Sequence, residues 1–219
     1  MIIKRLLFVG LIVVFSVVDL SSQTTFEGDS AYTPYRQSRW LAGITGGILS
    51  SSSDQQQGEN VFTNRYNFDI NISYFIKNRF LAGLEFNIFR SAIRELIERE
   101  SETLTVGPLG RFYLSPKGDG SVFFEAGVRH GRYWEKTTFT QQPGNKKYFQ
   151  FLSGKEIGAI LGIGYSHTLV DKIAFEMGMD YYFASQKGTI ENTLEGTLQT
   201  ADNQRIQFEF AIGFVIFLR

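Results

Sequence analysis

Apolar side chains recur at every second position through most of the chain, and this period of two constrains the fold more than any other feature. The last fifteen residues, RIQFEFAIGFVIFLR (205–219), alternate Ile, Phe and Leu with Arg, Gln, Glu, Ala and Gly. Strict alternation is typical of a β-strand whose two faces meet different environments. We find it in eight segments, which are 38–50, 61–76, 80–92, 101–115, 121–136, 153–168, 172–186 and 203–218.

The connections between these segments alternate in length. Short turns are expected at 77–79, 116–120 and 169–172, and longer polar loops around 51–60, 93–100, 141–147 and 191–202. Short turns at one end and long loops at the other are typical of outer-membrane barrels. The sequence therefore predicts an all-β fold, an eight-stranded antiparallel up-and-down transmembrane β-barrel over 38–219, with both termini on the periplasmic side. The stretch IRELIERE (93–100) leaves two alternatives, a short loop helix or a charged hairpin tip.

The composition of the polar face indicates that it points into the barrel. Most strand glycines fall on it, and glycine weakens a strand unless space is short. An eight-stranded barrel has an interior just wide enough for side chains to fill. The opposite orientation would place Arg65, Arg111 and Arg129 in lipid, at a cost of roughly 2–4 kcal/mol each near the bilayer midplane.

The first residues have the pattern of an export signal. Lys4 and Arg5 precede the apolar run LLFVGLIVVFSVV (6–18), and small polar residues follow around Ser22. A membrane anchor is the alternative, but a spanning helix needs about 20 apolar residues. We therefore expect a signal peptide at 1–22, an extended periplasmic lead-in at 23–37, and location in the outer membrane of a Gram-negative bacterium.

Charge and residue content exclude several functions. The net charge is zero, which gives no electrostatic basis for binding nucleic acid. There is no cysteine, so disulfides and thiolate metal sites are excluded, and we expect no cofactor and no metal.

The inward face of the predicted strands carries both acids and arginines. Such groups require pairing in a narrow lumen, because unpaired buried charges cost several kcal/mol each. We interpret them as an ionic network that fills the barrel, with a polar path for small solutes as the alternative. The predicted network consists of Arg65, Asp69, Glu85, Arg111, Glu125, Arg129, Glu176, Asp180, Arg205 and Glu209.

Two further sets of residues are expected to matter in the membrane, aromatic side chains on the outer face and an assembly signal on the last strand. Aromatic side chains near the strand ends fit an interfacial girdle, and these are Trp40, Tyr74, Phe80, Phe112, Phe124 and Trp134. The last strand is expected to carry the signal for the barrel-assembly machinery, at Gly213, Ile216 and Leu218.

A catalytic role has little support in the sequence. Only two histidines are present, and we place His130 on the outward face and His167 on the inward face, near opposite ends. That separation argues against a shared metal or an acid–base pair. His130 beside Glu135 is the weak candidate for a hydrolase, and we expect no enzyme.

The long loops are where binding is expected. The stretches 137–151 and 187–200 alternate in polarity themselves, which predicts strands that extend above the membrane. An exposed sheet edge there would suit capture of an extracellular partner by strand addition, with a long solvated hairpin as the equal alternative. Deleting 138–150 should abolish such binding.

Three stretches resemble a known family. INISYFIKNRFLAGLEFN (70–87), GPLGRFYLSP (107–116) and FFEAGV (123–128) are similar to the small outer-membrane β-barrel proteins of Bacteroidota, which share an OmpA/OmpX-like eight-stranded architecture. The resemblance implies fold and location and carries no catalytic residues. Chains of this family often end on an aromatic residue, whereas this one ends Phe217-Leu218-Arg219.

These observations predict a non-enzymatic outer-membrane barrel with a plugged polar lumen, acting in envelope structure or surface interaction through its extracellular loops. Its expected partners are outer-membrane lipid, the barrel-assembly machinery and an extracellular protein or ligand at the loops. A small-solute pore is the second hypothesis and an outer-membrane hydrolase the third. A soluble lipocalin-like carrier is the alternative fold.

Overall fold

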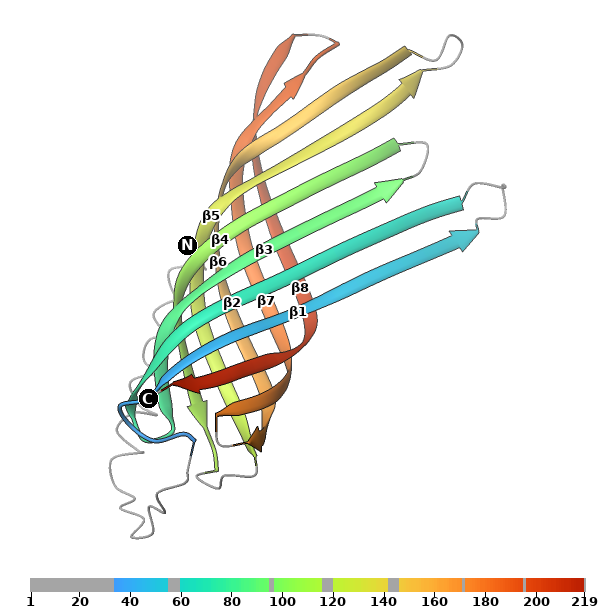
Figure 1. The fold of residues 1–219 in the computed structure, drawn as a ribbon. Coiled ribbons are helices and arrows are strands. Elements are labelled where there is room, and N and C mark those ends of the chain that lie inside the picture. The colour runs from blue at the N-terminus through green and yellow to red at the C-terminus, as the bar shows by residue number, and fades with distance from the viewer. Residues whose placement is uncertain are drawn as a thin grey trace.

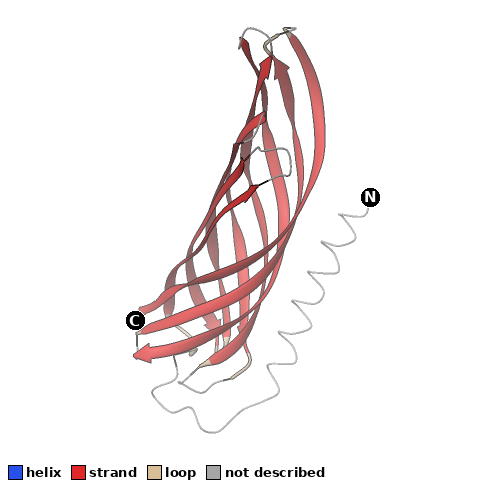
Figure 2. Ribbon diagram, turned by 90° about the vertical axis from the view of Figure 1, so that its right-hand side faces the viewer, coloured by secondary structure: helices blue, strands red, loops and turns tan. Residues whose placement is uncertain are grey.

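The computed structural model describes residues 34–54, 60–94, 97–115, 120–141, 146–170, 172–194 and 196–218. Eight antiparallel strands pair in chain order and close into a barrel (Figures 1 and 2), which confirms the predicted fold class. They are β1 (Trp40–Asp54), β2 (Asn60–Lys77), β3 (Phe80–Arg94), β4 (Ile97–Tyr113), β5 (Ser121–Gln141), β6 (Lys146–Val170), β7 (Ile173–Asn192) and β8 (Thr197–Leu218). The predicted signal peptide, 1–22, and most of the lead-in lie outside the described residues.

The strands at the long-loop end extend beyond the eight predicted segments, as the alternation of 137–151 and 187–200 predicted. β5 and β6 stay paired as far as Gln141 and Lys146, and β7 and β8 as far as Asn192 and Thr197. The helix alternative for 93–100 is wrong, because Ile93 pairs with Arg99 in a β3–β4 hairpin. In the described part of the chain, no helix is long and apolar enough to cross a membrane.

The seam between the first and last strands is the shortest pairing in the barrel wall. β1 and β8 pair only from Trp40 with Leu218 to Gly46 with Ile212. Beyond that point they diverge toward the long-hairpin end, as Figure 1 shows. The barrel is therefore closed around its short-turn end, and the described β8 keeps one neighbour, β7, over 197–211.

The alternation places apolar side chains outside and polar ones inside through the middle of the barrel. Ile70, Leu161 and Phe214 are exposed on the outer face, while Asp69 and Arg129 are buried within. An apolar exterior over a polar interior is the arrangement of a membrane barrel and the reverse of a soluble one.

Glycines stand directly across from the large inward side chains. In the hydrogen-bonded register a long residue on one strand meets a glycine on the next, so the two together fill a limited space. These pairs are Glu85 with Gly107, Phe123 with Gly164, Glu125 with Gly162, Arg129 with Gly158, Gly131 with Glu156, and Glu176 with Gly213. The excess of inward glycines thus has a steric reason.

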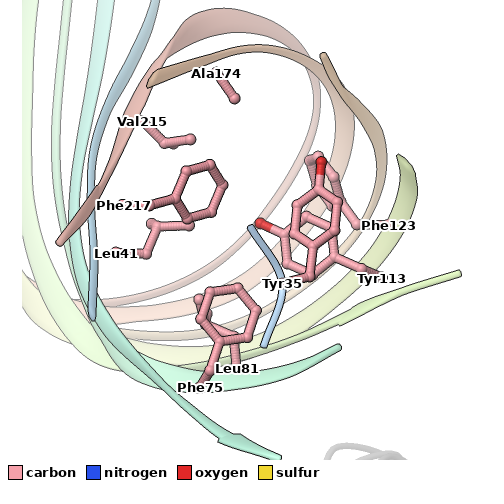
Figure 3. Packing of buried hydrophobic residues seen from close by; sticks show 9 residues of the cluster. All are labelled: Tyr35, Leu41, Phe75, Leu81, Tyr113, Phe123, Ala174, Val215 and Phe217. Carbon is pink, nitrogen blue, oxygen red and sulfur yellow. The ribbon is translucent and has the colours of Figure 1, made fainter. Parts of the chain in front are cut away.

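The short-turn end of the lumen is filled by aromatic and aliphatic side chains (Figure 3). The buried cluster contains Tyr35, Leu41, Phe75, Leu81, Tyr113, Phe123, Ala174, Val215 and Phe217. Inward apolar residues in this region depart from the polar lumen that the alternation predicted. We call this cluster the aromatic base.

Tyr35 comes from the segment before β1 and lies inside the barrel. Its ring stacks on Tyr113 with centroids 4.2 Å apart and meets the edge of Phe217 at 5.8 Å. The backbone is held too, since Arg79 N donates to Tyr35 O at 2.7 Å and Ser38 N donates to Phe75 O at 2.9 Å. The end of the expected extended lead-in is therefore a turn that closes the base.

Candidate functional site: the lumen and its mouth

Three arginines cross the lumen above the aromatic base, each on a different strand. Arg111 of β4 is the lowest. Its guanidinium lies 2.7 Å from Glu125 and 2.7 Å from Glu176, and all three side chains are at least nine-tenths buried. The guanidinium also lies over the Phe123 ring at 4.1 Å, so this tier rests directly on the base.

Arg129 of β5 forms the middle tier. Its Nη2 donates to Asp69 at 3.0 Å and also to Glu85. Asn87 donates to Asp69 at 2.8 Å, which gives that carboxylate a second partner. Three charges and an amide from β2, β3 and β5 are thereby joined across the lumen, in the paired and hydrogen-bonded form that burial of charge requires.

Arg205 of β8 forms the upper tier. It lies 3.7 Å from Glu156, donates to Thr103 at 3.2 Å, and sits over the Phe89 ring at 4.2 Å. Tyr182 donates to the same Glu156 at 2.7 Å. The upper tier is thus held by an ion pair, a hydroxyl and an aromatic face together.

The remaining members of the predicted network are less centrally placed. Glu209 joins the middle tier through Asn67, whose amide donates to it at 2.6 Å. Asp180 and Glu125 crowd the same glycine, because an added Cβ at Gly162 would clash with both. Arg65 follows the inward phase of β2 but is exposed at the long-hairpin end. The other nine members of the predicted network lie in the lumen.

Sequence reasoning missed several residues that hold the tiers together. Glu156 is the most deeply buried carboxylate of the upper tier, at 1% exposure. It follows the same phase as Gly158 and Gly162, so the alternation of 153–168 could have located it. Tyr35 had no such signal, because no period governs 23–37 and only the folded base shows where its ring goes.

A cavity of about 600 Å³ lies at the long-hairpin end, above the Arg205 tier. Its lining comes from five strands, and consists of Phe89, Ser101, Thr103, Tyr133, Trp134, Glu135, Gln186, Asp202, Asn203, Gln204, Arg205 and Ile206. Below it the tiers and the aromatic base occupy the lumen. The described part of the barrel therefore has an open mouth and a filled end.

The predicted girdle aromatics lie at the two ends of the outer face. Trp40 and Tyr74 are adjacent, with centroids 5.1 Å apart, and Phe112 pairs across the sheet with both Phe80 and Phe124. Trp134 stands at the other end, paired with Glu102 and Ser153.

The residues expected to signal assembly divide between the two faces of β8. Ile216 and Leu218 are exposed on the outside. Gly213 faces inward, where an added Cβ would meet Ile44 O and Thr45.

The placement of His167 on the inward face is wrong. Both histidines are exposed on the outer face, and His167 stacks beside Tyr165, with centroids 6.4 Å apart. On β6 the even-numbered positions, which include the glycines, face inward, so the odd-numbered His167 faces outward. In the described ranges, no group of three or more His, Cys, Asp or Glu side chains could hold a metal ion.

Similarity to solved structures is found at the level of fold. The outer membrane protein OprG of Pseudomonas aeruginosa matches with a TM-score of 0.53 and 14% identity, covering 84% of this chain and 98% of that one. Neisserial surface protein A matches at 0.47 and 12%, covering 81% and 96%. A major outer membrane protein of Thermus thermophilus matches at 0.48 and 12%, covering 84% and 100%. No protein-family model and no curated protein matches the sequence.

Proposed function

We propose that this chain is an integral outer-membrane barrel with a plugged lumen, without enzymatic activity, which serves envelope structure or surface interaction through its long hairpins. The observation that carries the proposal is the combination of an apolar exterior with a filled interior. Large apolar side chains such as Ile70 and Leu161 are exposed all along the outer face, and an exposed apolar band requires lipid.

The plug rests on the aromatic base and the Arg111 and Arg129 tiers. Their side chains meet across the lumen by direct ion pairs and ring contacts. A hydrated ion would have to break at least one buried ion pair at each tier, and breaking a buried pair costs several kcal/mol. We therefore propose that these side chains block the lumen and that the barrel does not conduct ions.

Planar-bilayer recording of the purified protein tests the plug. We expect no reproducible conductance above that of the protein-free bilayer. A steady single-channel conductance would overturn the plug and support the small-solute pore instead. Such a pore should select cations, because acidic side chains outnumber arginines along the lumen.

Membrane location has a separate test. The folded protein should sediment with outer membranes and migrate differently on a denaturing gel before and after boiling. A water-soluble protein with no such shift would instead support the lipocalin-like carrier.

Surface interaction is supported by the free edge near the long hairpins. In the described strands β8 pairs with β1 only over Ile212–Leu218, so 197–211 presents an edge to its surroundings. Open edges are sites of strand addition. Two deletions test the hairpins. Deletion of 138–150 shortens the hairpin between β5 and β6, and deletion of 193–196 shortens the hairpin between β7 and β8, to which the edge strand belongs. Loss of binding in both deletions supports the hairpins as the contact surface; unchanged binding in both refutes it.

Export and assembly complete the proposal. A signal peptide at 1–22 would deliver the chain, and recognition of Gly213, Ile216 and Leu218 by the barrel-assembly machinery would insert it. The resemblance of 70–87 and 107–116 to barrels of Bacteroidota supports an origin in that group.

A further inference from the structure

We propose that the outer face of the barrel carries a binding site for the phosphate groups of outer-leaflet lipopolysaccharide. The inference rests on the proposed membrane location, and it names the lipid that one part of the outer face holds. The site is a row of three basic side chains, Arg132 of β5, Lys155 of β6 and Lys187 of β7, which we call the basic row.

The basic row runs without interruption across three neighbouring strands. Arg132 pairs with Lys155, and Lys155 pairs with Lys187. Side chains at directly opposite positions of adjacent antiparallel strands have Cβ atoms about 4.5–5.5 Å apart. All three basic residues are exposed, whereas Tyr133 and Glu156, the next residues along β5 and β6, are buried on the inward face. The three cations therefore lie side by side on the outside of the barrel.

Two of these cations are free of partners within the protein. Across the ranges that the structure describes, neither Arg132 nor Lys155 makes an ion pair or a side-chain hydrogen bond. Leu104 stands across from Arg132 on β4, and the nearby acid Glu102 stands across from Arg90 instead. The centre of the basic row thus holds positive charge that no carboxylate neutralises.

The third cation is only weakly engaged. Lys187 lies 3.7 Å from Asp202, and both side chains are mostly exposed. An exposed ion pair of this kind contributes little and does not exclude another anion. Like charges at directly opposite positions also destabilise a sheet. An anion bound along the basic row would offset that repulsion.

The basic row lies at the upper limit of the apolar band. On β6 the exposed residues Tyr165, Leu161 and Ile157 lead up the outer face to Lys155. Ten residues separate Tyr165 from Lys155. A strand tilted by about 40° climbs roughly 25 Å over that length, which is the height of the apolar band of an outer-membrane barrel. With Tyr165 at the short-turn interface, Lys155 reaches the interface on the long-hairpin side, where the outer-leaflet headgroups lie.

Phosphate is the lipid group that suits these side chains. A guanidinium can donate two parallel hydrogen bonds to phosphate oxygens, and an ammonium attracts them as a compact charge. The exposed Ile157 and Leu161 below Lys155 offer apolar surface to acyl chains. A lipid with phosphates on its headgroup uses the charges and the apolar surface together, whereas a free anion uses the charges alone. This continuity of the two surfaces favours lipopolysaccharide.

The test is native mass spectrometry of the full protein, released from detergent micelles and titrated with bis-phosphorylated lipid A. We expect one lipid A to bind per barrel. The double variant Arg132→Gln with Lys155→Gln should weaken this binding by about tenfold or more, because it removes both unpaired charges and keeps long side chains. Lys187→Gln should weaken it by only about two- to fivefold, since Asp202 already shares that charge.

Two controls separate the basic row from charge and apolar contact in general. Lys77→Gln with Lys172→Gln removes two exposed cations at the short-turn end and should bind lipid A like the unaltered protein. Dephosphorylated lipid A keeps its acyl chains and should bind the unaltered protein about tenfold more weakly or worse. The boiling-dependent gel shift verifies that each variant is folded.

Equal affinity of the unaltered protein for the two forms of lipid A would overturn the proposal, and this comparison needs no variant to fold. Unchanged binding in the Arg132 and Lys155 double variant would overturn it too. Displacement of lipid A by about 10 mM inorganic phosphate would assign the basic row to a free anion instead. A barrel that sediments with outer membranes and ignores the phosphates overturns this inference alone, whereas a water-soluble protein overturns the proposed membrane location.

Discussion

The two ends of the lumen differ in what occupies them. At the short-turn end, Tyr35, Tyr113 and Phe217 exclude water by packing ring against ring. At the long-hairpin end, Tyr133 and Arg205 line a cavity open enough to hold a small molecule. Buried arginine tiers separate the two.

This difference separates a packed end of the barrel from an open one. Well-packed apolar groups stabilise the base, and buried ion pairs join strands across the lumen above it. The mouth has exposed ion pairs and a stretch of β8 that β1 no longer covers. We therefore expect substitutions in the tiers and the base to destabilise the protein more than substitutions at the mouth.

The largest effect is expected for Arg111→Ala. It would leave Glu125 and Glu176 buried without a cation, which typically costs about 3–5 kcal/mol. Urea unfolding in lipid vesicles, followed by tryptophan fluorescence, measures the loss. Arg99→Ala on the same strand is the control, because the Arg99–Glu135 pair is largely exposed and should matter by less than about 1 kcal/mol. Equal losses of stability in Arg111→Ala and Arg99→Ala would contradict the difference between the tiers and the mouth.

Tyr35→Ala should follow, with a loss of about 3 kcal/mol from the emptied base. Arg36→Ala, an exposed neighbour in the same turn, should leave the unfolding midpoint unchanged. Neither variant should conduct ions in planar bilayers, because the Arg111 and Arg129 tiers remain. Current through Tyr35→Ala would mean that the turn before β1 alone seals the lumen.

Gly213→Ala tests crowding at the β1–β8 seam. Its Cβ would press on the backbone at Ile44 and Thr45, and overpacking of this kind costs about 1–3 kcal/mol. Gly178→Ala is the matched control on β7, since its nearest neighbour would lie 3.6 Å away. The same vesicle-based unfolding separates them, and a harmless Gly213→Ala would show that the seam yields easily.

The smallest effect is expected at the mouth. Lys187 and Asp202 are 75% and 65% exposed at a separation of 3.7 Å, so Lys187→Ala should change unfolding by no more than about 0.5 kcal/mol. A larger loss, measured in the same way, would place structural ion pairs at both ends of the barrel.

The sequence predicted strands and faces well and individual partners poorly. Arg111 with Glu125 joins residues directly across a strand pair, so the hairpin register was enough to bring them together. Glu176 comes from β7 and Asp69 reaches Arg129 from β2, and such contacts across the lumen depend on strand tilt and stagger. His167 was misplaced because one residue of phase error moves a side chain to the other face.

The alternation of apolar and polar residues by itself determined that this chain forms eight strands with an apolar outer face and a polar, glycine-rich inner face. That pattern is local, because each strand repeats it over a few residues. The tertiary structure alone decided that the lumen is aromatic at one end, tiered in the middle and hollow at the other. These features bring together side chains from strands far apart in sequence, and closure of the barrel fixes which of them meet.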